Sequence, residues 1–245
     1  ASSLACNGRE EEALDIYRAT LDIVTHHNPH LRTGSPPPGR GNSYELIHGC
    51  MVLQTNIANT LGALGRHDEA IARHRRVRGA WDHMFPEGNA AYVRQTDGSQ
   101  ISTTTRAEIE KTYARERLFS TLNLASSLIA YEPKRTDLLH EARSLLLDNM
   151  AEALRVLGAT SEGALLWRGN YARTIYYDEG ASDDDVAEAN AIADDIESIA
   201  RQHSGEYHPL TGMFQRLGYD SEDSGDSEST ADGGEPPEPD AGETA

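Results

Sequence analysis

The sequence predicts an all-α fold built from antiparallel helix pairs, mainly because it contains an internal repeat. The dipeptide Glu-Ala recurs at Glu12-Ala13, Glu69-Ala70, Glu141-Ala142 and Glu188-Ala189. Three of these dipeptides are preceded in the chain by a second pattern: Asn, an apolar residue, Ala, two small or polar residues, and an apolar residue. That pattern begins at Asn56, Asn123 and Asn170. Self-similarity on this scale is typical of repeat arrays, in which each unit packs on the next.

The spacing of these landmarks supports a common register. Asn123 and Asn170 are 47 residues apart, and so are Ala142 and Ala189. The shortest interval between the repeated Asn and Ala is the 14 residues from Asn56 to Ala70. Counting back the same interval from Ala13 places the corresponding Asn before residue 1. The first repeat is therefore expected to be incomplete, which gives about 3.5–4 repeats.

The helices are predicted from apolar periodicity and from start and stop signals. The clearest periodicity runs from Leu138 to Leu157. Capping signals at Thr105–Glu108 and acidic residues at Ser182–Asp185 indicate two helix starts. Alanines at the repeated positions allow two helices to approach closely. The expected helices are 9–26, 43–63, 67–84, 107–131, 134–157, 160–178, 183–203 and a short capping helix at 209–217.

Two insertions and a tail interrupt or follow the repeat domain, which spans 1–218. Residues 28–42 contain three consecutive prolines and are expected to form a flexible loop. Residues 88–105 contain Asp97-Gly98 between two β-prone runs, which predicts a small β-hairpin or a long loop. Residues 219–245 hold ten acidic and no basic residues, so a disordered acidic tail is expected.

The segment Asn56 to Ala70 has the form Asn-x-Ala-x-x-Leu-x-x-x-Gly-Arg-x-x-Glu-Ala. Gly205 to Thr211 has the form Gly-x-x-His-Pro-x-Thr. Both resemble the tetratricopeptide family, and more closely its kinesin-light-chain type. The resemblance implies a right-handed superhelical solenoid that binds peptides or proteins in a concave groove.

The first helix of each pair lines the concave surface of such a solenoid. The three repeated Asn residues and the residues three positions further on share a face of these helices. The predicted partner-binding residues are Asn56, Asn59, Asn123, Ser126, Asn170 and Arg173. An amide can both donate to and accept from a peptide backbone, but each Asn could instead bond a neighbouring helix. Arg173 favours an acidic or C-terminal carboxylate partner.

Chemical signatures are weak, so no enzyme activity, catalytic residue, metal or cofactor is expected. His140-Glu141 lacks the second His of a metalloprotease motif, and the His26, His27, His30 group matches a turn between repeats. The arginine-rich segment 66–78 is interpreted as a solvated helix face rather than a nucleic-acid patch.

The expected function is that of a protein-interaction scaffold. Its partner is a peptide or protein, alone or within a larger complex, and not a membrane or nucleic acid. The alternatives are an assembly subunit that stacks through its repeat ends or, with weaker support, an enzyme or metal-binding protein. Two cysteines and no apolar run of membrane-spanning length favour a cytoplasmic location.

Overall fold

The computed structural model describes residues 8–32, 44–84, 103–131 and 135–204. Within these ranges the secondary structure is helical, without strands. The helices are α2 (Glu10–His27), the short 3-10 helix η1 (Pro29–Arg32), α3 (Tyr44–Ala63), α4 (His67–Met84), α5 (Thr103–Tyr131), α6 (Thr136–Asp148), α7 (Met150–Leu157), α8 (Glu162–Tyr176) and α9 (Asp183–Ser204). The predicted all-α class is therefore confirmed for the described residues.

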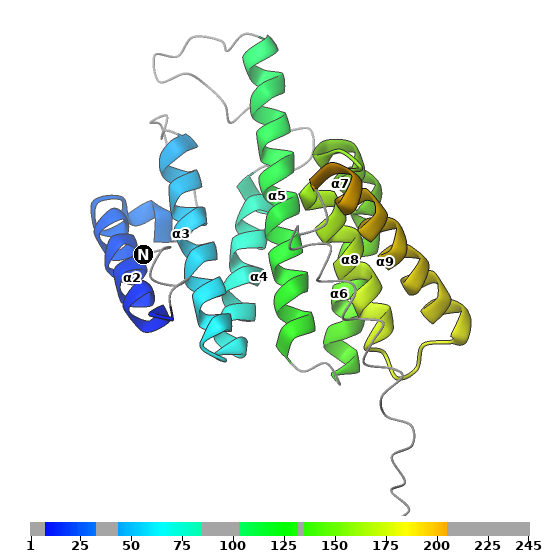
Figure 1. Cartoon of the computed structure of the whole chain (residues 1–245). Helices are drawn as coiled ribbons and strands as arrows, with labels where there is room; N and C mark the ends of the chain where they lie inside the picture. The colour runs from blue at the N-terminus through cyan, green and yellow to red at the C-terminus, as the bar shows by residue number, and fades with distance from the viewer. Residues whose placement is uncertain (1–7, 33–43, 85–102, 132–134, 205–245) are drawn as a thin grey trace, which may run out of the picture.

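Helices that follow one another in the chain pack together, from α2 at one end to α9 at the other (Figure 1). Short turns join α3 to α4 and α8 to α9, so these neighbours run in opposite directions. α4 packs against α3 and α5, and α6 packs against α5 and α8. In addition, α3 contacts α5 and α5 contacts α8. We refer to these three helices as the α3–α5–α8 layer.

The turn after α3 is a Schellman motif. The Arg66 N–H donates to the Leu61 carbonyl at 2.8 Å, and the Gly65 N–H donates to the Gly62 carbonyl at 3.0 Å. Gly65 has a φ of +74°, a left-handed conformation that favours glycine. The motif turns α4 back onto α3 so closely that a Cβ on Gly62 would lie 4.0 Å from the Ala70 Cβ.

The predicted start of α9 is confirmed, but the predicted start of α5 is wrong. Ser182 and Asp185 bond reciprocally: the Ser182 N–H donates to the Asp185 carboxylate, and the Asp185 N–H donates to the Ser182 hydroxyl oxygen. Hydrogen bonds from the Ser182 side chain and backbone lower the pKa of Asp185. In contrast, α5 begins at Thr103, so Thr105 lies inside the helix and not at its cap.

The repeated alanines lie where the helices meet. All seven are buried: Ala13, Ala58, Ala70, Ala125, Ala142, Ala172 and Ala189. The small side chains at the repeated positions therefore lie inside the packed helices. The largest core cluster joins side chains of α4 to α8 around Trp167, and a second cluster joins α2, α3 and α4.

The single helix predicted at 134–157 is instead two helices, α6 and α7, separated at Asn149. The indole N–H of Trp167 donates to the Leu146 carbonyl at 2.9 Å, and the Asn149 amide donates to the Leu145 carbonyl at 2.9 Å. These two side chains satisfy carbonyls at the end of α6. A side chain that bonds to helix carbonyls in this way is a recognised cause of a helix break.

Several predictions fall outside the described residues. These are most of the loop at 28–42, the hairpin at 88–102, the capping helix at 209–217 and the tail at 219–245. Two corrections can be made at the edges. Residues 29–32 form η1, and residues 103–105, included in the predicted hairpin or loop, belong to α5.

Candidate partner-binding face

The six predicted partner-binding residues all lie on the α3–α5–α8 layer. α3 carries Asn56 and Asn59, α5 carries Asn123 and Ser126, and α8 carries Asn170 and Arg173. His48 of α3 and Glu116 of α5 form an ion pair at 3.6 Å, provided that the histidine is protonated. The layer therefore places equivalent Asn positions on three neighbouring helices.

Asn56 and Asn123 are half-buried. Among the described residues, neither side chain has a hydrogen-bond partner. Asn59 is exposed and Ser126 is half-buried, again without a side-chain hydrogen bond to the described part of the chain. Two half-buried amides at matching positions thus retain their full capacity to donate and to accept.

Asn170 differs from the other two Asn residues. It is only 4 % exposed, and its amide N–H donates to the Leu166 carbonyl at 3.0 Å. Its amide oxygen accepts from the Arg173 guanidinium at 3.4 Å. The same guanidinium lies 5.6 Å from the centre of the Tyr177 ring. Asn170 therefore bonds within its own helix, and not to a neighbouring helix as the structural alternative supposed.

This face also carries apolar residues that were not predicted from the sequence. Val52, Phe119 and Leu166 stand four residues before the three repeated Asn residues, which places them on the same side of each helix. Val52 is exposed, and the other two are half-buried. The Arg115 guanidinium lies 5.5 Å from the centre of the Phe119 ring. Their regular spacing before each Asn was the signal that could have identified them.

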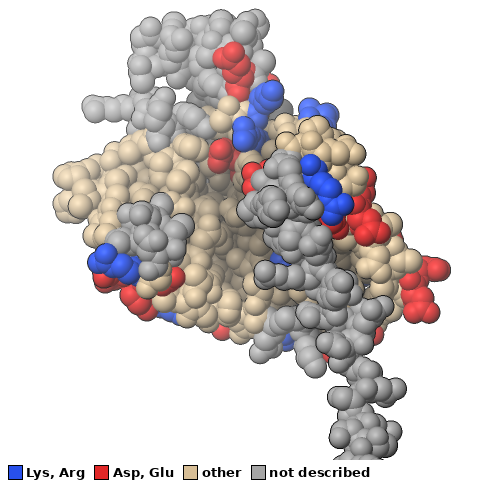
Figure 2. Space-filling model, in the orientation of Figure 1, with Lys and Arg blue, Asp and Glu red and all other residues tan. Residues whose placement is uncertain are grey.

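The described surface between α2 and α5 is mostly uncharged in the view of Figure 2. Charged side chains gather instead near the start of α2, over the first part of α5 and over α9 (Figure 2). α3 follows this pattern, because its exposed positions include Val52, Asn59 and Ala63. The amides and apolar groups of this face suit the uncharged backbone of a peptide.

A buried carboxylate ties α6 to the end of α8. Asp178 accepts from the Arg143 guanidinium at 3.0 Å and lies 3.2 Å from the His140 Nε2. Its other oxygen accepts from the Gly180 N–H at 3.1 Å. Burial raises the pKa of Asp178, but the hydrogen bonds from Gly180 and His140 and the charge of Arg143 outweigh burial and lower this pKa overall. Arg143 also donates to the Thr174 carbonyl at 2.7 Å.

We expect Asp178→Ala to lower the free energy of unfolding by about 2–3 kcal/mol, because it leaves Arg143 without its buried partner. Urea denaturation would measure the change. Asp137→Ala is the matched control, since it removes an exposed carboxylate that also pairs with an arginine, Arg135. Equal effects of the two substitutions would contradict a structural role for the buried contact.

The arginines of the basic segment 66–78 are largely engaged within the fold. Arg66 pairs with Glu69 at 2.7 Å, Arg75 with Glu141 of α6, and Arg78 with Asp82 at 4.0 Å. Arg73 donates to Gln54 of α3. Four of the five arginines in the basic segment thus have an intramolecular partner, and two of them, Arg73 and Arg75, bond to other helices.

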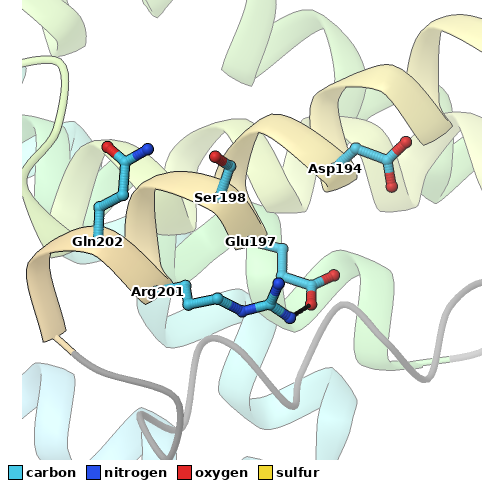
Figure 3. Close-up of a pocket in the computed structure, with 5 residues that line it drawn as sticks. All are labelled: Asp194, Glu197, Ser198, Arg201 and Gln202. Carbon is cyan, nitrogen blue, oxygen red and sulfur yellow. Dashed lines mark hydrogen bonds and ion pairs between the residues drawn. The ribbon is translucent and has the colours of Figure 1, made fainter.

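An open depression of about 340 Å³ lies at the other end of the array (Figure 3). Its described lining comes from one face of α9: Asp194, Glu197, Ser198, Arg201 and Gln202. Arg201 donates to Glu197, one turn away. These side chains show that the outer face of α9 is polar.

Comparisons with protein-family models, curated proteins and solved structures find no match to this chain. Within the described ranges, no three His, Cys, Asp or Glu side chains are grouped so that they could hold a metal ion. None of the described helices combines the length and the apolar character needed to cross a membrane.

Proposed function

We propose that this chain is a non-enzymatic interaction scaffold of the tetratricopeptide type. Its helix pairs form a right-handed solenoid, and an extended peptide lies across the α3–α5–α8 layer. The observation that carries the proposal is the pair of amides at Asn56 and Asn123. They occupy matching positions on adjacent helices and have no partner among the described residues.

The proposed mode of binding follows from the chemistry of this face. The Asn56 and Asn123 side chains donate to and accept from the peptide backbone, which makes binding tolerant of sequence. Val52 and Phe119 contact apolar peptide side chains. Arg115 and Arg173, each already near an aromatic ring, favour an acidic side chain or a C-terminal carboxylate. Asn170 supports Arg173 and does not itself contact the peptide.

The test begins with random peptides displayed on phage and selected on the wild-type protein. Recovered peptides are then measured with an Asn56→Ala, Asn123→Ala double variant. We expect the double variant to bind at least about tenfold more weakly, since each lost hydrogen bond contributes roughly 1 kcal/mol. Because neither side chain has a hydrogen bond to the described part of the chain, stability should change little.

Asn190→Ala provides the matched control, since Asn190 is an exposed asparagine on α9. This variant should bind the peptides as the wild type does. Equal affinity of the double variant and the wild type, or failure to recover any peptide, would overturn the proposed groove.

A further inference from the structure

α2 has an apolar outer face in addition to its packed inner face. Ala13, Leu14 and Tyr17 are buried against α3. On the opposite side, Ile16 is 45 % exposed and Ile23 is 63 % exposed. These two belong to the small group of large apolar side chains that the described residues expose.

The exposed isoleucines form part of a continuous stripe. Ala19 and Thr20 lie between them and are also exposed, so positions 16, 19, 20 and 23 follow the spacing of one helix face. The Thr20 hydroxyl donates to the Ile16 carbonyl at 2.8 Å, which satisfies its polar group within the helix. We refer to these four residues as the α2 stripe.

The opposite end of the array does not complement this stripe. The outer face of α9 carries Asp194, Glu197 and Arg201 among its exposed or half-exposed residues (Figure 3). Stacking of α2 on α9 of another copy would bury these charges against isoleucine, which is unfavourable. A head-to-tail filament is therefore disfavoured, and the apolar surface that best matches an α2 stripe is another α2 stripe.

We propose that two copies of this chain associate through their α2 stripes in an antiparallel, two-fold symmetric pair. The four residues of the α2 stripe form the seam between the two helices. With the axis between Ala19 and Thr20, Ile16 lies opposite the partner subunit's Ile23. Small residues at the crossing point let the two helices approach closely.

Charge along α2 selects the antiparallel orientation. The first turn is acidic, with Glu10, Glu11 and Glu12, and the last turn carries His26 and His27. An antiparallel pair brings Glu12 near the partner subunit's His27. It also sets the two helix dipoles in opposite directions, which is the favourable arrangement. A parallel pair would place the acidic turns together. The interface does not involve the α3–α5–α8 layer, so it is independent of the proposed peptide groove.

One contact in this register is unfavourable and provides a sharp test. Asp15 lies near the partner subunit's Asp22 at the edge of the seam, and symmetry repeats this repulsion. Asp22→Lys converts both repulsions to attractions. We expect it to lower the dimer dissociation constant measured by sedimentation equilibrium of the full chain. This result cannot arise from misfolding, which would weaken a specific dimer.

A substitution that disrupts the α2 stripe should have the opposite effect and weaken the dimer. Ile23→Glu should leave the protein monomeric at concentrations where the wild type is dimeric, with unchanged helical circular dichroism. Leu147→Glu is the matched control, because Leu147 is 55 % exposed but lies on α6. It should dimerise as the wild type does.

Cross-linking tests the register directly. Ala19→Cys, in a Cys6→Ser background in which Cys50 is buried, should form a covalent dimer under mild oxidation. Gln202→Cys on the polar face of α9 should not. A wild-type monomer at about 100 μM, a concentration at which even weak dimers form, would overturn the proposal. So would larger assemblies, or equal cross-linking at both positions.

Discussion

Trp167→Ala should lower the free energy of unfolding by about 3–5 kcal/mol, the range for removing a large buried aromatic side chain. Trp167 is fully buried, and it lies in the cluster that joins α4 to α8. Its loss leaves a cavity among α5, α6 and α8. Denaturant unfolding followed by circular dichroism would measure the effect without relying on tryptophan fluorescence.

Trp167→Phe separates packing from hydrogen bonding. Phenylalanine keeps much of the apolar volume but cannot donate to the Leu146 carbonyl, so we expect a loss of about 1–3 kcal/mol. Leu147→Ala, an exposed change beside the same helix break, is the control and should be nearly neutral. If both Trp167 variants changed stability as little as Leu147→Ala, the indole would not be holding the break.

His74→Leu should remove a large acid-dependent loss of stability. His74 lies in α4 and is only 1 % exposed, and neither ring nitrogen has a hydrogen-bond partner within the described part of the chain. Burial lowers its pKa from 6.5 to about 4. The unfolded chain therefore binds this proton more readily than the folded protein does between these two values.

The direction of the effect follows from that difference. Above about pH 6.5 His74 is neutral in both states and has no effect on the pH dependence of stability. As the pH falls towards 4, the wild type should lose about 3 kcal/mol through this group, and the loss should level off below. His74→Leu should lack this loss, because leucine does not titrate.

Urea unfolding of both proteins at a series of pH values would measure the difference. His67→Leu, a change on the same helix at a half-buried position, is the control and should retain the wild-type acid dependence. Comparing variants cancels the contribution of carboxylates such as Asp178. Parallel stability curves for the wild type and His74→Leu would contradict the role of the buried ring.

How much could be predicted from the sequence differs between the helices and the candidate partner-binding face. The repeated alanines are local signals, and they identified the packed sides of the helices. The break at Asn149 has no such signal, since neither glycine nor proline stands there. The long-range contact beside it comes from Trp167, whose indole N–H donates to the Leu146 carbonyl 21 positions away along the chain.

The candidate face shows the same limit. The repeat register identified Asn56, Asn123 and Asn170 as equivalent, and the structure places them on neighbouring helices. The repeat register could not show that the Asn170 side chain bonds to Leu166 and Arg173, whereas the Asn56 and Asn123 amides have no such bonds within the described ranges. That difference arises from burial and side-chain orientation, which depend on neighbours from other parts of the chain.

The reach of α5 has a consequence for how the molecule unfolds. At 29 residues it is about 43 Å long, and it contacts α3, α4, α6, α7 and α8. In a simple linear array each unit stabilises only the next, so the ends can unfold separately. Here α5 packs both against the helices that precede it, α3 and α4, and against those that follow it, α6, α7 and α8. Unfolding of α5 removes packing contacts from the preceding and the following helices at the same time. The cooperativity of unfolding therefore depends mainly on this one helix.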